Sequence, residues 1–241
     1  KVEIIDTGET TEIPETSGSS TTAEPAPAIV KVAEILELEQ FTCLHEQDEP
    51  AIFADTDEEN AKLLAAIGFG DNAIVQGFTE DGVTKFRGDA YTNRAEVLKI
   101  LMVASCTPSD LTFEEIFRDI KLKDWHRPYI GSAKQLNIVE GYQDGTFRPA
   151  KLVSVIEAIK MTARIAGIAA APDSCEAKPF IDMPDDHWGF SVARDAFCAG
   201  IVTGELKDEE RYLYPDEPLT RSQMALLIRN YYAAALGAVK K

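Results

Sequence analysis

Hydrophobic positions recur at helical spacing in three separate segments of the chain. The apolar residues of these segments are Val97, Ile100, Leu101 and Ala104 in the first, Ile156, Ile159, Ala163 and Ala166 in the second, and Met224, Leu227, Ile228 and Tyr231 in the third. Intervals of three or four residues place such side chains on one face of a helix. We therefore expect three amphipathic helices, each with one face to bury.

Each helix belongs to a unit that repeats with a period of about 63 residues. A unit carries a Phe-x-Asp triplet, an Ile-Val pair whose Val follows the Phe by 22 residues, and a glycine two residues later. The triplets begin at Phe53, Phe117 and Phe180, the pairs end at Val75, Val139 and Val202, and the glycines are Gly77, Gly141 and Gly204. Agreement at three offsets indicates three tandem repeats, with glycine providing positive φ in a tight turn.

Within each unit the pattern predicts a helix, a Gly-rich loop and a second helix. We expect the first helices near residues 57–67, 126–136 and 187–199, each capped by the Asp of the triplet or by the Asp and Asn residues after it. One unit alone buries too little apolar surface to be stable, so the units should pack on one another. The fold class is mainly all-α, with three helix-loop-helix repeats in a pseudo-threefold arrangement. The predicted units are 29–108, 109–173 and 174–241, and a further helix is expected at 30–43.

The N-terminal residues differ from the rest of the chain in composition. Residues 1–28 are acidic and rich in Thr, Ser and Pro, with few large apolar side chains after residue 7. Such a composition does not bury enough surface to offset the entropy lost on ordering. We expect a linker or stalk there. The net charge of the whole chain is −17, and much of it lies in the N-terminal residues.

The acidic balance excludes some classes of partner. Nucleic acids and anionic membranes require clustered Lys and Arg, and the sequence has no basic stripe. No apolar run approaches the roughly 20 residues that span a bilayer, so membrane insertion is not expected. The chain opens on Lys1 without a signal segment, and we expect a processed chain or a fragment of an exported protein.

The four cysteines are Cys43, Cys106, Cys175 and Cys198, and none forms a Cys-x-x-Cys pair. Zinc binding is therefore not expected. Cys43 and Cys106 precede Phe53 and Phe117 by similar distances. We favour the disulfides Cys43–Cys106 and Cys175–Cys198, with free buried thiols as the alternative.

No catalytic or metal-binding constellation is present in the sequence. There is no Gly-x-Ser-x-Gly elbow, Walker loop or His-Glu-x-x-His motif. His126 and His187 have no third ligand at metal spacing, and we interpret them as caps or surface groups. The Glu80-Asp81-Gly82 and Gln143-Asp144-Gly145-Thr146 segments lack the ligands of a calcium loop and are predicted to be turns. We expect no enzyme activity and no cofactor.

Several motifs together resemble the S-layer homology family. They are the Phe-x-Asp triplets, the Trp-His and His-Trp pairs, Ile-Val-x-Gly, the Gly-Tyr-Gln-Asp-Gly-Thr-Phe-Arg-Pro run at 141–149 and the Thr-Arg helix start, and they cover roughly residues 30–235. The resemblance implies a three-pronged spindle around a central helical bundle. It also implies an extracellular location at the cell envelope and grooves between prongs that bind a cell-wall polysaccharide.

In that family a Thr-Arg-Ala-Glu sequence supplies an Arg that contacts an acidic, typically pyruvylated, sugar. The resemblance carries this role to Arg94 and Arg221, with Asn93, Glu96 and Thr220 beside them. A planar guanidinium binds a carboxylate with two hydrogen bonds. We therefore expect both Arg side chains at surface grooves, where Arg221→Ala weakens binding and leaves the melting temperature nearly unchanged. The alternative is a solvated first-turn Arg next to a capping residue.

The second unit has Val155 in place of the Arg, and the first unit has Ala61 where the others have Trp125 and Trp188. At most two grooves are then competent, with Gly77 and Gly204 in the adjacent loops. We expect the Trp rings to be half-buried anchors between units, and stacking on a sugar is the alternative.

The leading hypothesis is a non-catalytic envelope-anchoring module that binds cell-wall glycan. The main alternative is a structural domain that docks onto protein subunits of a surface layer or filament. A third reading is a module appended to an enzyme that lies outside this chain.

Overall fold

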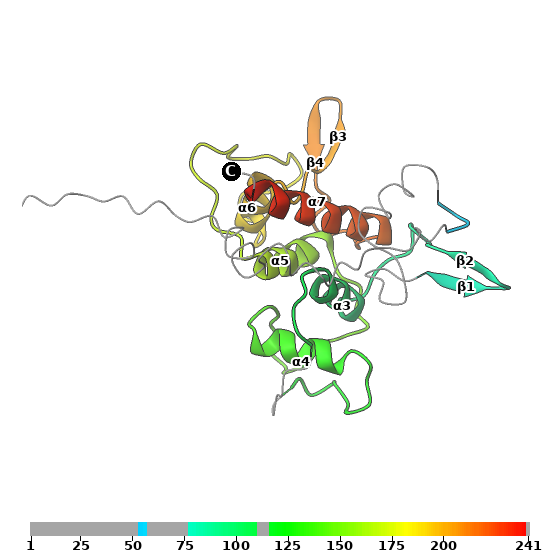
Figure 1. Cartoon of the computed structure of the whole chain (residues 1–241). Coiled ribbons are helices and arrows are strands. Elements are labelled where there is room, and N and C mark those ends of the chain that lie inside the picture. Colours follow the sequence, from blue (N-terminus) through cyan, green and yellow to red (C-terminus); the bar gives the residue numbers. More distant parts are fainter. Residues whose placement is uncertain (1–52, 57–76, 110–115, 240–241) are drawn as a thin grey trace, which may run out of the picture.

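The computed structural model of the protein describes residues 53–56, 77–109 and 116–239 (Figure 1). The elements in chain order are β1 (Phe78–Glu80), β2 (Val83–Lys85), α3 (Arg94–Ala104), α4 (Arg127–Gln135), α5 (Val155–Ala166), α6 (Phe190–Cys198), β3 (Glu205–Lys207), β4 (Glu210–Tyr212) and α7 (Arg221–Val239). The linker at 1–28 and the helices predicted at 30–43 and 57–67 lie outside the described residues.

Helices α3, α5 and α7 lie together and contact one another in all three pairs (Figure 1). All three were predicted from the spacing of apolar residues. Of the twelve apolar positions in that pattern, eleven are buried and Ala163 is partly exposed. The three helices therefore bury their apolar faces in one shared core.

Capping residues determine where these three helices begin. At each start, the N-cap side chain accepts a hydrogen bond from the backbone N–H of the third residue after it. The side chain of that third residue accepts a hydrogen bond from the backbone N–H of the N-cap residue. The pairs are Asn93 with Glu96, Ser154 with Glu157, and Thr220 with Gln223. Arg94, Val155 and Arg221 consequently occupy the first position of α3, α5 and α7.

Helices α4 and α6 fall within the predicted ranges 126–136 and 187–199, and they pack on α3 and α5. The predicted capping is wrong for both. Their N-cap residues are His126 and Gly189, and neither helix has a side-chain cap hydrogen bond.

The aspartate of each Phe-x-Asp triplet has a different role from the predicted cap. Its carboxylate accepts hydrogen bonds from two consecutive backbone N–H groups later in the same unit. Asp55 binds Phe86 and Arg87 at 2.6 and 2.8 Å, Asp119 binds Phe147 and Arg148 at 2.8 and 2.7 Å, and Asp182 binds Leu213 and Tyr214 at 2.8 and 2.7 Å. The second residue of each pair has a φ between 53° and 58°. The carboxylate thus holds a left-handed backbone that bulky residues rarely adopt.

The glycine that follows each Ile-Val pair lies close to the phenylalanine ring of its own unit. A Cβ at Gly77 would overlap the Phe53 ring, and a Cβ at Gly141 would overlap the Phe117 ring. At Gly204 a Cβ would lie 2.8 Å from the ring of Phe180. Of these three glycines only Gly204 has a positive φ, of 70°, so the expected turn conformation is wrong for Gly77 and Gly141.

Backbone hydrogen bonds connect each helix start to the loop of a different unit. The N–H of Arg94 donates to the carbonyl of Lys151 at 3.0 Å, and that of Val155 donates to Glu217 at 3.0 Å. The N–H of Arg221 donates back to Ala90 at 2.9 Å. The first unit is thereby linked to the second, the second to the third, and the third to the first.

Two short antiparallel hairpins were not predicted. Strand β1 pairs with β2 and β3 with β4, and both hairpins project away from α3, α5 and α7 (Figure 1). Asp81 and Gly82 turn the first hairpin, with φ of 50° and 76°. Two consecutive residues with positive φ are typical of a tight hairpin turn. The turn predicted at Glu80-Asp81-Gly82 is therefore present.

Candidate functional site

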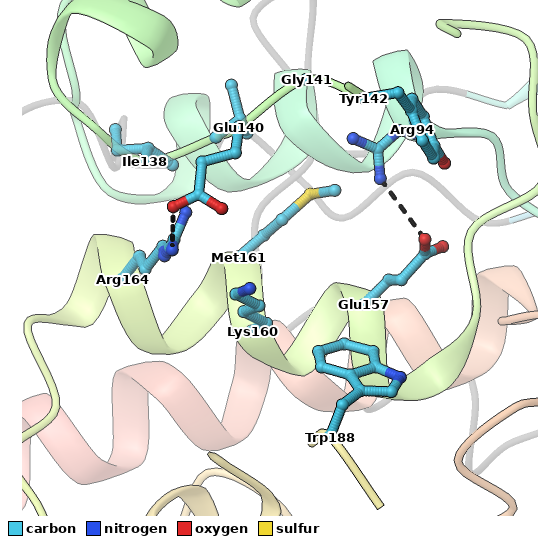
Figure 2. Close-up of a pocket in the computed structure, with 11 residues that line it drawn as sticks. Arg94, Ile138, Glu140, Gly141, Tyr142, Glu157, Lys160, Met161, Arg164 and Trp188 are labelled. Atoms are coloured by element: carbon cyan, nitrogen blue, oxygen red, sulfur yellow. Dashed lines mark hydrogen bonds and ion pairs between the residues drawn. The ribbon is translucent and has the colours of Figure 1, made fainter. Parts of the chain in front are cut away.

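A hollow of about 180 Å³ opens between α3, the loop at 138–142, α5 and the start of α6 (Figure 2). We name it the Lys160 groove. Its lining consists of Arg94, Ile138, Val139, Glu140, Gly141, Tyr142, Glu157, Lys160, Met161, Arg164 and Trp188. Three cationic side chains face two carboxylates there, so the groove is locally cationic in an acidic chain.

Arg94 forms part of the wall of this groove and is itself buried, with 6% of its surface exposed. Its Nε donates a hydrogen bond to the carbonyl oxygen of Phe147 at 3.0 Å. The guanidinium carbon lies 4.7 Å from the ring centroid of Phe147 and 5.3 Å from that of Tyr142. Contacts of this kind fix a guanidinium on aromatic faces. The side chain joins the first unit to the loop of the second.

Arg221 has the same environment in the loop of the first unit. Its Nε donates to the carbonyl of Phe86 at 2.8 Å, and its guanidinium lies 4.8 and 5.0 Å from the rings of Phe78 and Phe86. Burial lowers the pKa of Arg221 from its ordinary value, against an opposing effect of Glu96. The expectation that Arg94 and Arg221 are surface residues is therefore wrong, because each is packed against two rings of another unit.

Lys160 is the residue of the groove that sequence reasoning missed. It lies on α5, and Figure 2 shows its side chain between Trp188 and the facing wall. Its Nζ lies 5.3 Å from the Trp188 ring centroid. Among the described residues, no ion pair involves Lys160. A repeated spacing could have pointed to it. Lys160 lies six residues after the N-cap of α5, and Lys99 lies six residues after the N-cap of α3.

The other two cations of the groove are paired with carboxylates. Arg164 binds Glu140 at 2.6 Å, and Arg94 lies 3.7 Å from Glu157 (Figure 2). The hydrogen bond from Arg164 lowers the pKa of Glu140 below its ordinary value of 4.5. Lys160 is left as the cation best placed to bind an anion from solution.

Both tryptophans are about half exposed. Trp125 and Trp188 have 54% and 56% of their surface exposed, so each ring is open to solvent on part of its surface. Trp188 also borders a second hollow of about 330 Å³ that contains Lys151, Ser154 and Asp216 among its lining. An exposed indole next to a cation can stack on the apolar face of a sugar.

The remaining predicted site residues have structural contacts. Asn93, Glu96 and Thr220 cap helices, as described above. Gly77 and Gly204 lie against phenylalanine rings, and Gly204 also lines a hollow next to Val155. Ala61 lies outside the described residues.

The histidines beside the tryptophans differ in their contacts. His187 accepts a hydrogen bond from the N–H of Gly189 at 3.1 Å, and its other ring nitrogen lies 3.3 Å from Asp216. His126 is the N-cap residue of α4. Within the described part of the chain, no group of three His, Cys, Asp or Glu side chains is arranged to hold a metal ion.

Cys175 and Cys198 form a disulfide that joins the segment before the third triplet to the end of α6, with a Cα–Cα distance of 6.1 Å. Cys106 is also disulfide-bonded. Its predicted partner, Cys43, lies outside the described residues. None of the helices in the described ranges has the length and apolarity of a membrane span.

Comparison with known proteins identifies one family. The model of the S-layer homology domain matches residues 116–159. Cell surface glycoprotein 1 of Acetivibrio thermocellus is 26% identical over 112 residues, which are 46% of this chain and 4% of that protein. Amylopullulanase of Thermoanaerobacterium thermosulfurigenes is 28% identical over 120 residues, which are 50% of this chain and 6% of that enzyme.

Exoglucanase XynX of Acetivibrio thermocellus is 28% identical over 116 residues, which are 48% of this chain and 10% of that enzyme. The chain thus spans a tenth or less of the length of each of these relatives. The matched segment 116–159 includes the triplet at Phe117, the loop at 138–142 and the capped start of α5. Residues 116–159 of this chain are therefore similar to the S-layer homology domain, and the three relatives match over about half of the chain.

Proposed function

We propose that this chain is a non-catalytic module that anchors a larger exported protein to the cell envelope by binding an acidic cell-wall polysaccharide in the Lys160 groove. The observation that carries the proposal is the pairing of a cation, Lys160, with an exposed aromatic ring, Trp188, inside a hollow. An acidic sugar has charged and hydroxyl groups as well as an apolar face, and this groove places a cation and an aromatic ring side by side.

The residues of the Lys160 groove would contact different parts of the sugar. The Lys160 ammonium binds a sugar carboxylate, such as that of a pyruvyl group, and the Trp188 ring covers the apolar face of the sugar. Arg94 and Arg164 are engaged by Glu157 and Glu140, so they shape the groove and add positive potential. This reading differs from the family expectation, in which the Arg binds the ligand directly.

A second groove of the same kind is proposed at the start of α7. Arg221 takes the place of Arg94, and Glu96 lies close enough to influence the pKa of Arg221. Lys99 stands six residues after the N-cap of α3, as Lys160 does in α5, and the exposed Trp125 takes the position of Trp188 in its unit. We propose that the three units form a pseudo-threefold spindle with these two cationic grooves.

The relatives support an anchoring role. One is named as a cell surface glycoprotein, and in the two enzymes the match covers a small share of the protein. This pattern fits a module that holds larger proteins of different activities at the envelope. We propose an extracellular location on that basis.

The alternative is a domain that binds protein subunits of a surface layer. Exposed apolar side chains at the hairpins favour it, with Leu206 67% and Phe78 38% exposed. Exposed apolar groups on projecting hairpins can contact a neighbouring protein. This function requires no polysaccharide, so one experiment separates the two.

The test is cosedimentation of the chain with protein-stripped cell walls, before and after mild acid removal of the polymer. The variant Lys99→Gln/Lys160→Gln tests both grooves without disturbing the buried Arg contacts, and Lys207→Gln on the β3–β4 hairpin is the matched control. We expect wild type and control to sediment with intact walls only, and the double variant to remain in solution. Sedimentation that survives either polymer removal or the double substitution would refute glycan binding in these grooves.

A further inference from the structure

A hollow of about 330 Å³ lies between α5, α7 and the loop of the third unit. We name it the Val155 hollow. It is lined by Val155, Ile159, Ile201, Val202, Thr203, Gly204, Glu205, Tyr212, Leu213, Tyr214, Leu219, Gln223, Leu226, Leu227 and Asn230. Glu205 is the only charged residue of this lining.

The Val155 hollow occupies the same place in its unit as the Lys160 groove does in the preceding one. Both are built from the first residue of a helix, the loop after an Ile-Val pair and the outer face of a capped helix. The corresponding residues, groove first, are Arg94 and Val155, Tyr142 and Glu205, Phe147 and Leu213, Glu157 and Gln223, and Lys160 and Leu226. These pairs were matched by counting from three landmarks that both units share. The landmarks are the N-cap of the helix, the loop glycine, and the two backbone N–H groups bound by Asp119 or Asp182.

Every feature of the Lys160 groove that concerns charge is replaced together in the Val155 hollow. The guanidinium is lost along with both aromatic rings that hold it, and Lys160 is replaced by Leu226, which is partly buried as Lys160 is. The position next to the loop glycine carries Glu205 instead of an aromatic ring. An anion entering this hollow would meet no cation among the described lining residues, and the Glu205 carboxylate is already paired with Lys207 at 3.2 Å.

The buried polar side chain of the hollow, Asn230, already has hydrogen-bond partners. Asn230 is buried, donates to the carbonyl of Ile201 at 3.2 Å and accepts from Arg229 at 2.9 Å. A hydroxyl-rich sugar ring would lose hydrogen bonds to water against walls of Ile, Val and Leu. An apolar ring would lose none, and burying it is favourable by about 25 cal/mol per Å².

We propose that the Val155 hollow binds an uncharged apolar group, on the order of six to ten carbon atoms in size, as a ring or a short chain. An apolar cavity of about 150 Å³ accommodates benzene, and this hollow has about twice that volume. This inference does not rest on glycan binding by the Lys160 groove.

The test is a titration of the isotope-labelled chain, followed by amide resonances of Val202, Gly204 and Leu226. Three ring compounds of similar size serve as probes: cyclohexanol, cyclohexanecarboxylate and methyl glucoside. We expect saturable shifts with cyclohexanol, at least tenfold weaker binding of the carboxylate, and no shifts at these amides with the glucoside. Equal or tighter binding of the carboxylate or the glucoside would overturn the proposal, as would the absence of saturable shifts with cyclohexanol.

Two variants locate the binding within the hollow. Leu226→Trp fills it and should abolish the cyclohexanol shifts, whereas Ala233→Trp, at an exposed position of the same helix, should preserve them. Leu226→Lys places an ammonium group in the Val155 hollow, and it replaces Leu226→Trp as the test variant if Leu226→Trp does not fold. It should weaken cyclohexanol binding and remove the preference against the carboxylate. Unchanged binding in a folded Leu226 variant would show that the ligand binds elsewhere.

Discussion

The Nε atom of Arg94 donates a hydrogen bond to the carbonyl oxygen of Phe147, at 3.0 Å and 53 residues along the chain. Arg221 makes the same bond to Phe86 at 2.8 Å, so two of the three helix starts hold the loop of another unit through a buried guanidinium. The residue that the family motif marks as a sugar ligand is, in this chain, a structural link between units.

Replacement of these arginines should therefore destabilise the protein. Arg94→Ala and Arg221→Ala each remove a charged hydrogen bond and leave a buried carbonyl without its partner, which costs about 2 kcal/mol. Arg94→Lys should recover only part of this, because an ammonium does not reproduce the planar contact with two rings. The measurement is the free energy of unfolding in urea. An unchanged urea midpoint in the alanine variants would show that the side chains are surface groups after all.

A second prediction concerns the contact between Gly141 and Phe117. Gly141→Ala should destabilise the chain by roughly 1–3 kcal/mol, because its Cβ overlaps the ring and forces a local shift. Phe117→Leu in the same chain should recover part of that loss, which a double-mutant cycle measures as a coupling energy. Gly82→Ala is the control, because nothing lies near its Cβ and only its positive φ is affected. Full additivity of the Gly141 and Phe117 substitutions would contradict the packing account.

Acid should weaken the fold at a defined range of pH. Hydrogen bonds from Thr146 and Arg148 lower the pKa of Asp144 from 3.8 to about 2. Burial raises the pKa of Asp55, but hydrogen bonds from the N–H groups of Arg87 and Phe86 outweigh it and lower that pKa below 3.8. A carboxyl with a lowered folded pKa stabilises the protein above its unfolded pKa and loses this effect as pH falls through the folded value.

The free energy of unfolding should accordingly stay level as pH falls toward the ordinary carboxyl pKa, and then decline between about pH 4 and pH 2. The Asp144→Asn variant should show a shallower decline than wild type in urea unfolding measured across that range. A stability that rises on acidification would mean that these carboxyls are not held in their charged form by the fold.

The positions of the helices α3, α5 and α7 could be read from the sequence because their apolar residues follow one helical face, from Val97 to Ala104 in the first. The strands β1 and β3 could not be predicted, because each has three residues that are all exposed and therefore shows no alternation of apolar and polar positions. The pseudo-threefold arrangement remains a prediction. It is supported by the hydrogen bonds that Asp55, Asp119 and Asp182 each accept from two consecutive backbone N–H groups.

The candidate site was less predictable. The Thr-Arg motif correctly indicated where α3 and α7 begin. The burial of Arg94 depends on Tyr142 and Phe147, two rings that another unit supplies, and the sequence does not show this proximity. Lys160 carries no motif of its own. Its significance depends on its distance from Trp188, which lies in the next unit.

The salt dependence of binding provides a further prediction. The Lys160 groove is open to solvent on the side of Trp188, so its attraction for an acidic polymer should be screened by salt. Binding measured by cosedimentation should fall as salt increases, while the urea midpoint, which depends mainly on buried contacts, should change much less. Binding that is insensitive to salt would point to apolar contacts, as the subunit-docking alternative requires.

We propose that Lys160, beside Trp188, binds the acidic group of a cell-wall polymer. The measurement is isothermal titration of the purified polymer into three chains that all carry Lys99→Gln, which disables the second proposed groove at the start of α7. One chain keeps Lys160, and the others carry Lys160→Gln or Lys160→Arg. We predict that Lys160→Gln weakens binding roughly tenfold, or about 1.4 kcal/mol, and that Lys160→Arg retains most of the affinity. Equal affinity in the Lys160→Gln variant, with its fold intact, would contradict the account.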